Sequence, residues 1–170
     1  MEPIRLLIKF FLFLTAFAPL VVLSNLPFPF VLGKILFFRS VIEIALILFL
    51  IYLIFNFKNL KLLNFDLPFS GLKHLNFETL KLLNFLYVFL FLFLVSLIIS
   101  AIFAENSYRA FWGDLERGEG LFGFLHFFAF LIMSVAIFEK KDWLNFFKIS
   151  LSVGFIVIFY AFKQKDVIDG

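Results

Sequence analysis

Long apolar stretches separated by short polar connections dominate the pattern of the chain. Five of them reach or approach the roughly 20 residues that an α-helix needs to cross a hydrocarbon core about 30 Å thick. The pattern therefore predicts an all-α polytopic transmembrane helix bundle with about five spans. The predicted spans are Leu6–Leu23, Leu36–Phe55, Leu82–Phe103, Gly120–Phe138 and Phe146–Phe162.

The first and last spans depart from an ideal apolar helix. Pro19 lies inside the first span and should kink it or end it early. Ala16–Ala18 resembles a signal-peptide cleavage site, but the apolar run continues to Leu23, so an uncleaved first helix is favoured. The last span is the shortest, and Lys148 near its start should extend its ammonium group toward the interface.

The composition agrees with a membrane protein. Of the 170 residues, 64% are hydrophobic and 16% are charged, whereas a soluble domain is roughly 45–50% apolar and about 25% charged. A soluble domain of this size could not bury so much apolar surface. We therefore expect one transmembrane domain over residues 1–170, with the 31 phenylalanines serving as lipid-facing or packing residues.

The distribution of positive charge predicts the orientation, because cytoplasmic loops are richer in lysine and arginine. With the N-terminus in the cytoplasm, nine basic residues are cytoplasmic and six are external. The cytoplasmic set is Arg5, Lys9, Lys58, Lys61, Lys73, Lys81, Lys140, Lys141 and Lys148; the external set is Lys34, Arg39, Arg109, Arg117, Lys163 and Lys165. The net charge of +3 is modest and forms no basic stripe, so nucleic acid is not expected as a partner.

The longest connection runs from Asn56 to Lys81. It contains Leu-Lys-Leu-Leu-Asn-Phe at 60–65, and the sequence recurs at 80–85. Pro68 predicts a turn between an interfacial helix and the third span, for which Asn76 is the candidate cap. The lysines should meet anionic headgroups of the membrane lipids.

Two opposite charges lie inside the second predicted span. Arg39 and Glu43 are four residues apart and therefore share one helix face. Because a charge near the bilayer centre costs about 2.5–3.5 kcal/mol, we expect Glu43 to face the bundle interior, paired with Arg39 or Lys34. This intramembrane polar pair serves either packing or a polar substrate path.

The external connection 105–120 combines arginines, acids and a tryptophan. Trp112 suits the interface, and Arg109 and Arg117 could bind phosphate oxygens in a bidentate manner. Alternatively, both arginines pair with neighbouring acids such as Glu116 and fix the loop. The spacing leaves both interpretations open.

His126 lies in the outer half of the fourth predicted span. An intramembrane histidine is either a functional group or the donor of one interhelical hydrogen bond. The GxGxxG pattern at 118–123 opens a membrane helix and lacks the strand that a dinucleotide site requires. The sequence shows no nucleophile–base pair and no metal triad, so neither a metal nor a cofactor is expected.

Two segments resemble one bacterial branch of the O-antigen ligase family. Residues 108–126 are similar to its Arg-x-Phe-Trp-Gly…Glu-Arg-x-x-Gly-Leu…His stretch, and residues 29–43 are similar to the segment that enters its second span. The resemblance covers about a fifth of the chain. It marks five positions of unknown role as candidate substrate-binding or lipid-phosphate-binding residues: Arg109, Trp112, Glu116, Arg117 and His126.

The resemblance implies an enzyme of the cytoplasmic (inner) membrane with about twelve spans. Such enzymes of lipopolysaccharide biosynthesis transfer or polymerise glycans from an undecaprenyl diphosphate carrier at the outer face. Their catalytic arginine and histidine residues lie C-terminal to the region resembled, so no catalytic residue is carried over, and whether the chain is itself an enzyme stays open. We expect an N-terminal membrane module of a longer polypeptide; a non-catalytic scaffold and a small transporter subunit are the alternatives.

Overall fold

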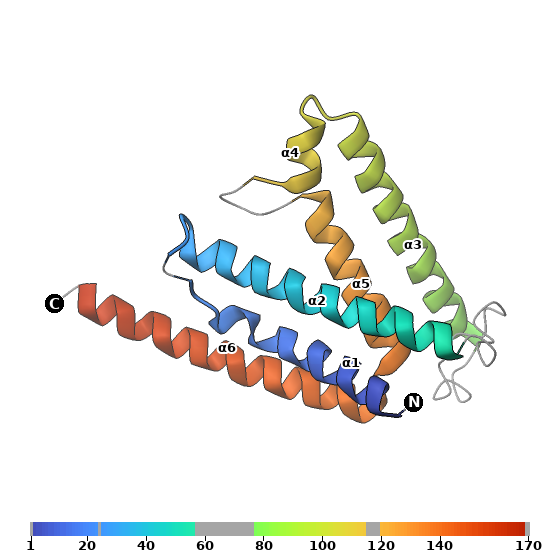
Figure 1. Cartoon of the computed structure of the whole chain (residues 1–170), viewed down its shortest axis with the longest axis horizontal. Helices are drawn as coiled ribbons and strands as arrows, with labels where there is room; N and C mark the ends of the chain where they lie inside the picture. The colour runs from blue at the N-terminus through green and yellow to red at the C-terminus, as the bar shows by residue number, and fades with distance from the viewer. Residues whose placement is uncertain (1, 24, 57–76, 115–119, 169–170) are drawn as a thin grey trace.

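The computed structural model describes residues 2–23, 25–56, 77–114 and 120–168 and is helical, without a strand among them (Figure 1). A helix follows wherever the sequence is apolar, since an α-helix satisfies its own backbone hydrogen bonds. The elements are α1 (Glu2–Leu14), η1 (Thr15–Leu20), α2 (Pro29–Asn56), α3 (Phe77–Ile102), α4 (Ser107–Trp112), α5 (Leu121–Ile137) and α6 (Lys140–Ile168).

The helices run alternately in opposite directions. The N-terminus, the end of α2, the start of α3 and the α5–α6 turn lie toward one end of the molecule (Figure 1). The η1–α2 turn, α4 and the C-terminal part of α6 lie away from that end. This alternation matches a chain that crosses a layer repeatedly.

The core lies where α1, α2 and α5 meet. It joins Ile8 and Leu12 of α1 to Ile42 and Ala45 of α2 and to Met133 of α5, all fully buried. Most other large apolar side chains are exposed; Phe159 on α6, for example, is 75% exposed. A soluble protein rarely exposes so much contiguous apolar surface, so the fold indicates membrane association.

Among the described residues, three helical segments are long and apolar enough to cross a bilayer: Glu2–Leu20, Pro29–Phe55 and Lys140–Lys163. Two shorter apolar segments within the described part of the chain are Val88–Ile102 and Leu121–Ile137. They correspond to the third and fourth predicted spans. The all-helical class is thus confirmed, while the count of five spans stays a prediction.

The end of the first helix and the start of the last helix can be compared with the predicted spans. Regular α-helix stops at Leu14, and a 3-10 helix containing Pro19 follows, as expected for a proline in the first span. The last helix, however, was predicted to be the shortest span, beginning at Phe146, whereas α6 has 29 residues and begins at Lys140. The Asp142 side chain accepts a hydrogen bond from the backbone N–H of Glu139 at 2.9 Å and so stabilises an earlier start.

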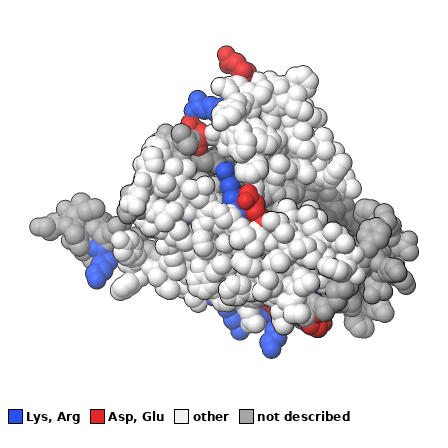
Figure 2. Space-filling view, viewed as in Figure 1, with Lys and Arg blue, Asp and Glu red and all other residues white. Residues whose placement is uncertain are grey.

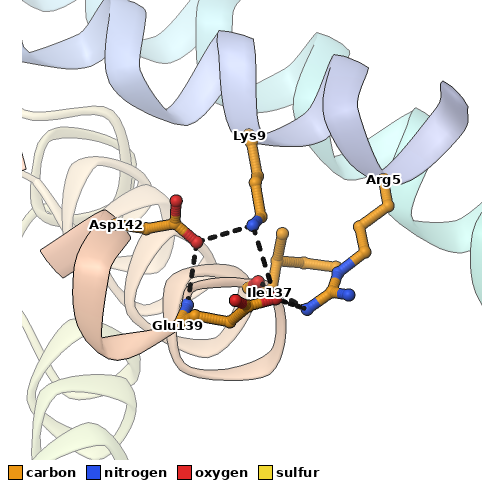
Figure 3. Close-up of polar contacts among 5 residues, drawn as sticks. All are labelled: Arg5, Lys9, Ile137, Glu139 and Asp142. Atoms are coloured by element: carbon orange, nitrogen blue, oxygen red, sulfur yellow. Dashed lines mark hydrogen bonds and ion pairs between the residues drawn. The ribbon is translucent and has the colours of Figure 1, made fainter. Parts of the chain in front are cut away.

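A network of charges ties the first helix to the α5–α6 turn (Figure 3). The Lys9 ammonium lies 2.6 Å from Asp142 and 3.8 Å from Glu139. The Arg5 guanidinium lies 2.9 Å from Glu139 and also donates to the carbonyl oxygen of Ile137 at 3.4 Å. We call these four charged residues the N-terminal charge cluster. It holds together two parts of the chain that are more than 130 residues apart.

The predicted interfacial helix, Pro68 turn and Asn76 cap lie outside the described residues; α3 begins directly after them, at Phe77.

Candidate functional site

A hydrogen bond between α2 and α5 joins two of the residues singled out in the sequence. The Nε2 atom of His126 lies 3.2 Å from the Oε1 atom of Glu43. The Nδ1 atom of His126 lies 2.7 Å from the carbonyl oxygen of Phe122, one helical turn earlier. The histidine side chain is 8% exposed and the glutamate side chain 54% exposed. His126 therefore makes an interhelical contact, and its partner is Glu43.

Glu43 was expected to face the bundle interior beside Arg39 or Lys34. Its side chain is directed toward α5, lines a pocket of about 260 Å³ between α2 and α5, and is half exposed. Glu43 and His126 both line that pocket, with apolar residues around them. Arg39 lies one turn before Glu43 and interacts with the glutamate electrostatically. The Cζ atom of its guanidinium lies over the Phe122 ring, 5.2 Å from the ring centroid. The ring face of an aromatic residue attracts such a cation.

A larger groove lies toward the N-terminal end of the same two helices. It has a volume of about 440 Å³ and is lined by Lys34 and Arg39 of α2 and by apolar residues of η1, α2 and α5. Among its described lining residues none is acidic. In the space-filling view, a positive and a negative group lie side by side within a mostly uncharged face (Figure 2). We call this cavity the α2–α5 groove.

α5 begins at the α2–α5 groove. Its N-cap residue is Gly120, without a side-chain hydrogen bond at the cap, and Gly120 and Gly123 both line the groove. The start of a helix carries a partial positive charge. It therefore adds to the positive character that Lys34 and Arg39 give to the groove.

The short helix α4 presents the Arg-Phe-Trp stretch. The Asn106 side chain caps it by accepting a hydrogen bond from the backbone N–H of Arg109 at 3.0 Å. The Arg109 guanidinium pairs with Asp114, which favours the interpretation that this arginine fixes the loop. Trp112 is 46% exposed and packs on Phe122 with ring centroids 5.0 Å apart. Glu116 and Arg117 lie outside the described residues.

Two glycines close the base of the loop between α4 and α5. Gly113 has a φ of 85°, which favours glycine. A Cβ atom on Gly120 would lie 2.3 Å from the Gly113 backbone nitrogen and 2.6 Å from the Phe111 carbonyl oxygen. No side chain fits there without movement of the backbone, so the sequence needs glycine at 120.

The arrangement can bind an anion, but the described residues show no reactive constellation. They include no cluster of three metal-binding side chains. The structure brings Glu43 together with His126 and places Arg39 beside them, whereas Arg109 is held on α4 by Asp114. Lys34 in a groove was not singled out as a site residue by the sequence analysis. The sequence feature that could have indicated Lys34 is a lysine within two turns of the start of an apolar helix.

Comparisons with known proteins give no relative. A scan against protein-family models, a search of curated proteins and a search of solved structures each found no match to this chain.

Proposed function

We propose that the chain is the N-terminal membrane module of a protein of the cytoplasmic membrane that transfers or polymerises glycans from an undecaprenyl diphosphate carrier at the outer face. The proposal rests on the resemblance of residues 29–43 and 108–126 to the O-antigen ligase family. It includes a cytoplasmic N-terminus, five spans and a longer polypeptide that supplies the catalytic region.

The contact between the two resembling segments is the observation that carries the proposal. Glu43 ends the first segment and His126 ends the second, and their side chains are hydrogen-bonded although the residues are 83 positions apart. Lys34 and Arg39 of the first segment also share the α2–α5 groove with Gly120 and Gly123 of the second. Motif residues that gather where α2 meets α5 are expected of a binding site, whereas unrelated similarities would be scattered.

The test uses the full-length gene in cells that lack their own copy. Glycan transfer from the lipid carrier is measured for wild type, His126→Ala, Arg109→Ala and Arg117→Ala. We expect at least a tenfold loss for His126→Ala, and Lys163→Gln serves as a control at an exposed cation of α6. Wild-type transfer in all three alanine variants would remove the proposed role of the motif.

A second candidate is a non-catalytic scaffold, and the Arg109–Asp114 ion pair favours it. If the ion pair of Arg109 fixes the loop, the presence of this arginine is explained without a substrate. The reading frame separates the two candidates: continued coding beyond codon 170 for further spans supports the enzyme module, and a stop codon supports the scaffold.

A further inference from the structure

The first turns of α6 separate their charges onto two sides of the helix. Asp142 points toward α1, where the Lys9 ammonium lies 2.6 Å from its carboxylate (Figure 3). Lys140, Lys141 and Lys148 are exposed. In a helix with about 3.6 residues per turn they fall within roughly a third of the circumference, on the side away from Asp142. We call these three lysines the α6 lysine face.

Cations of α1, rather than lysines of α6, neutralise the two acids at the α5–α6 turn. Glu139 accepts a hydrogen bond from Arg5 at 2.9 Å, and Asp142 pairs with Lys9. None of the ion pairs between described residues includes a residue of the α6 lysine face. Helix α1 has one further acid, Glu2 in its first turn. The α6 lysine face therefore keeps an excess of positive charge beside the neutralised N-terminal charge cluster.

Apolar side chains continue the outer side of α6 next to the lysines. Leu144, Phe147 and Leu151 are all exposed. The Phe147 ring stacks on Trp143, with ring centroids 6.0 Å apart, and such aromatic side chains are typical of the membrane interface. The surface thus offers positive groups beside hydrocarbon, which suits a molecule with a negative headgroup and acyl chains.

Lys148 determines how far this surface extends along the helix. It lies seven residues beyond Lys141 on the same side of α6, which corresponds to about 10.5 Å along the axis. The Cα–Cβ bonds of a helix tilt toward its N-terminus. Lys148 can therefore extend its ammonium back toward the headgroups while its methylene groups stay among the acyl chains. The ammonium groups of Lys141 and Lys148 then reach the same headgroup layer.

We propose that the α6 lysine face binds an anionic phospholipid of the leaflet that faces the α5–α6 turn. The negative phosphate complements the excess positive charge, and the acyl chains cover Leu144 and Leu151. A soluble anion or an acidic peptide would leave these two side chains exposed. Each lysine near an anionic surface strengthens binding roughly fivefold. The proposal goes beyond glycan transfer and holds for either orientation of the chain.

The experiment compares two lipids that share the same acyl chains and differ in headgroup charge. The whole chain in detergent micelles is titrated with dioleoyl phosphatidylglycerol or dioleoyl phosphatidylcholine, and bound lipid is counted by native mass spectrometry. We expect phosphatidylglycerol to bind the wild-type chain about tenfold more tightly. Equal affinity for the two lipids would overturn the proposal.

A double variant locates the site. Lys141→Gln combined with Lys148→Gln should lower the preference for phosphatidylglycerol at least about fivefold, whereas arginine at both positions should keep it. The matched control combines Lys34→Gln with Lys163→Gln, which removes the same two charges elsewhere on the chain, and it should keep the preference. Because Lys141 and Lys148 are exposed, the glutamine variant should unfold at the same temperature as wild type.

Three results would exclude this site. An unchanged preference in the glutamine variant would show that the α6 lysine face does not bind the lipid. An equal loss in that variant and in the control would mean that net charge alone sets the preference. Tighter binding of a hexaglutamate peptide than of phosphatidylglycerol would assign the surface to an acidic protein segment. If the glutamine double variant does not fold, Lys148→Gln against Lys163→Gln makes the same comparison with single changes.

Discussion

The Nε2 atom of His126 on α5 and the Oε1 atom of Glu43 on α2 lie 3.2 Å apart, and the second ring nitrogen of His126 lies 2.7 Å from its own helix's carbonyl oxygen at Phe122. The ring is thus held from both sides. These two contacts give both ring nitrogens a polar partner, which lowers the cost of placing ionisable groups within predicted spans.

We predict that Glu43→Ala weakens the α2–α5 contact. The variant leaves the buried Nε2 atom of His126 without its partner, and interhelical hydrogen bonds of this kind contribute about 0.6–1.7 kcal/mol. Thermal unfolding in detergent should therefore start at a lower temperature. Glu43→Gln keeps an oxygen that can accept a hydrogen bond, so its unfolding temperature should fall less than that of Glu43→Ala. Equal unfolding temperatures for wild type and Glu43→Ala would show that the contact does not stabilise the fold.

The helical class and the positions of the apolar segments could be predicted because they depend only on the length of each apolar run. The partner of Glu43 could not be predicted in this way. A helix that is apolar on all sides carries no stripe that tells which face meets a neighbour, and α2 is such a helix apart from a few charges. The rotation that brings Glu43 to His126 is set by packing of Ile42 and Ala45 in the core.

The start of α6 and the N-terminal charge cluster were missed for a related reason. Charged residues at 139–142 read as a connection between spans, although Asp142 both stabilises the helix start and binds Lys9. Helix-start chemistry is local and could have been recognised from Asp142. The ion pair with Lys9 spans most of the chain, and no local pattern indicates it.

We predict that the Lys9–Asp142 pair stabilises the fold more than the Arg5–Glu139 pair. The side chains of Lys9 and Asp142 are 17% and 19% exposed, against 31% and 62% for Arg5 and Glu139. Removing Lys9 should lower the free energy of unfolding by about 1–2 kcal/mol, which lies between the values for exposed and buried ion pairs. Removing Arg5 should lower it by about 0.2–1 kcal/mol.

Two double-mutant cycles in detergent measure the difference between these pairs. One combines Lys9→Met with Asp142→Asn, and the other combines Arg5→Met with Glu139→Gln. A coupling energy for the Arg5 cycle that equals or exceeds that of the Lys9 cycle would contradict the prediction.

We predict that Gly120→Ala opens the junction of α4 and α5. The new methyl group would overlap backbone atoms of Gly113 and Phe111, and overpacking of this kind costs about 1–3 kcal/mol. Gly154→Ala is the matched control, since a Cβ atom on Gly154 would meet nothing within 4 Å. The control should be neutral or more stable by up to about 1 kcal/mol through helix propensity.

The Gly120 and Gly154 variants are compared by thermal unfolding and by tryptophan fluorescence. Trp112 lies next to the overlap, so its emission should shift in Gly120→Ala and stay unchanged in Gly154→Ala. Two variants with the same stability and emission would show that the close approach of the backbones is not required.

The orientation of the chain is tested by single cysteines, which the sequence allows because it contains none. Ser107 is exposed at the start of α4, and Lys141 is exposed near the start of α6. Helix α4 and the start of α6 lie toward opposite ends of the molecule (Figure 1). Ser107→Cys should therefore react in intact cells with a maleimide that cannot cross the membrane, and Lys141→Cys should react only after permeabilisation.

The labelling pattern also tests the proposed glycan transfer. A glycan that is transferred at the outer face can reach α4 and the outer end of the α2–α5 groove only if Ser107 is external. The reverse pattern, with Lys141→Cys labelled from outside and Ser107→Cys protected, would invert the orientation and exclude the proposed glycan transfer at these residues. Labelling of both positions from outside would mean an even number of crossings between them, and the fourth predicted span, Leu121–Ile137 in the structure, would then not cross the bilayer.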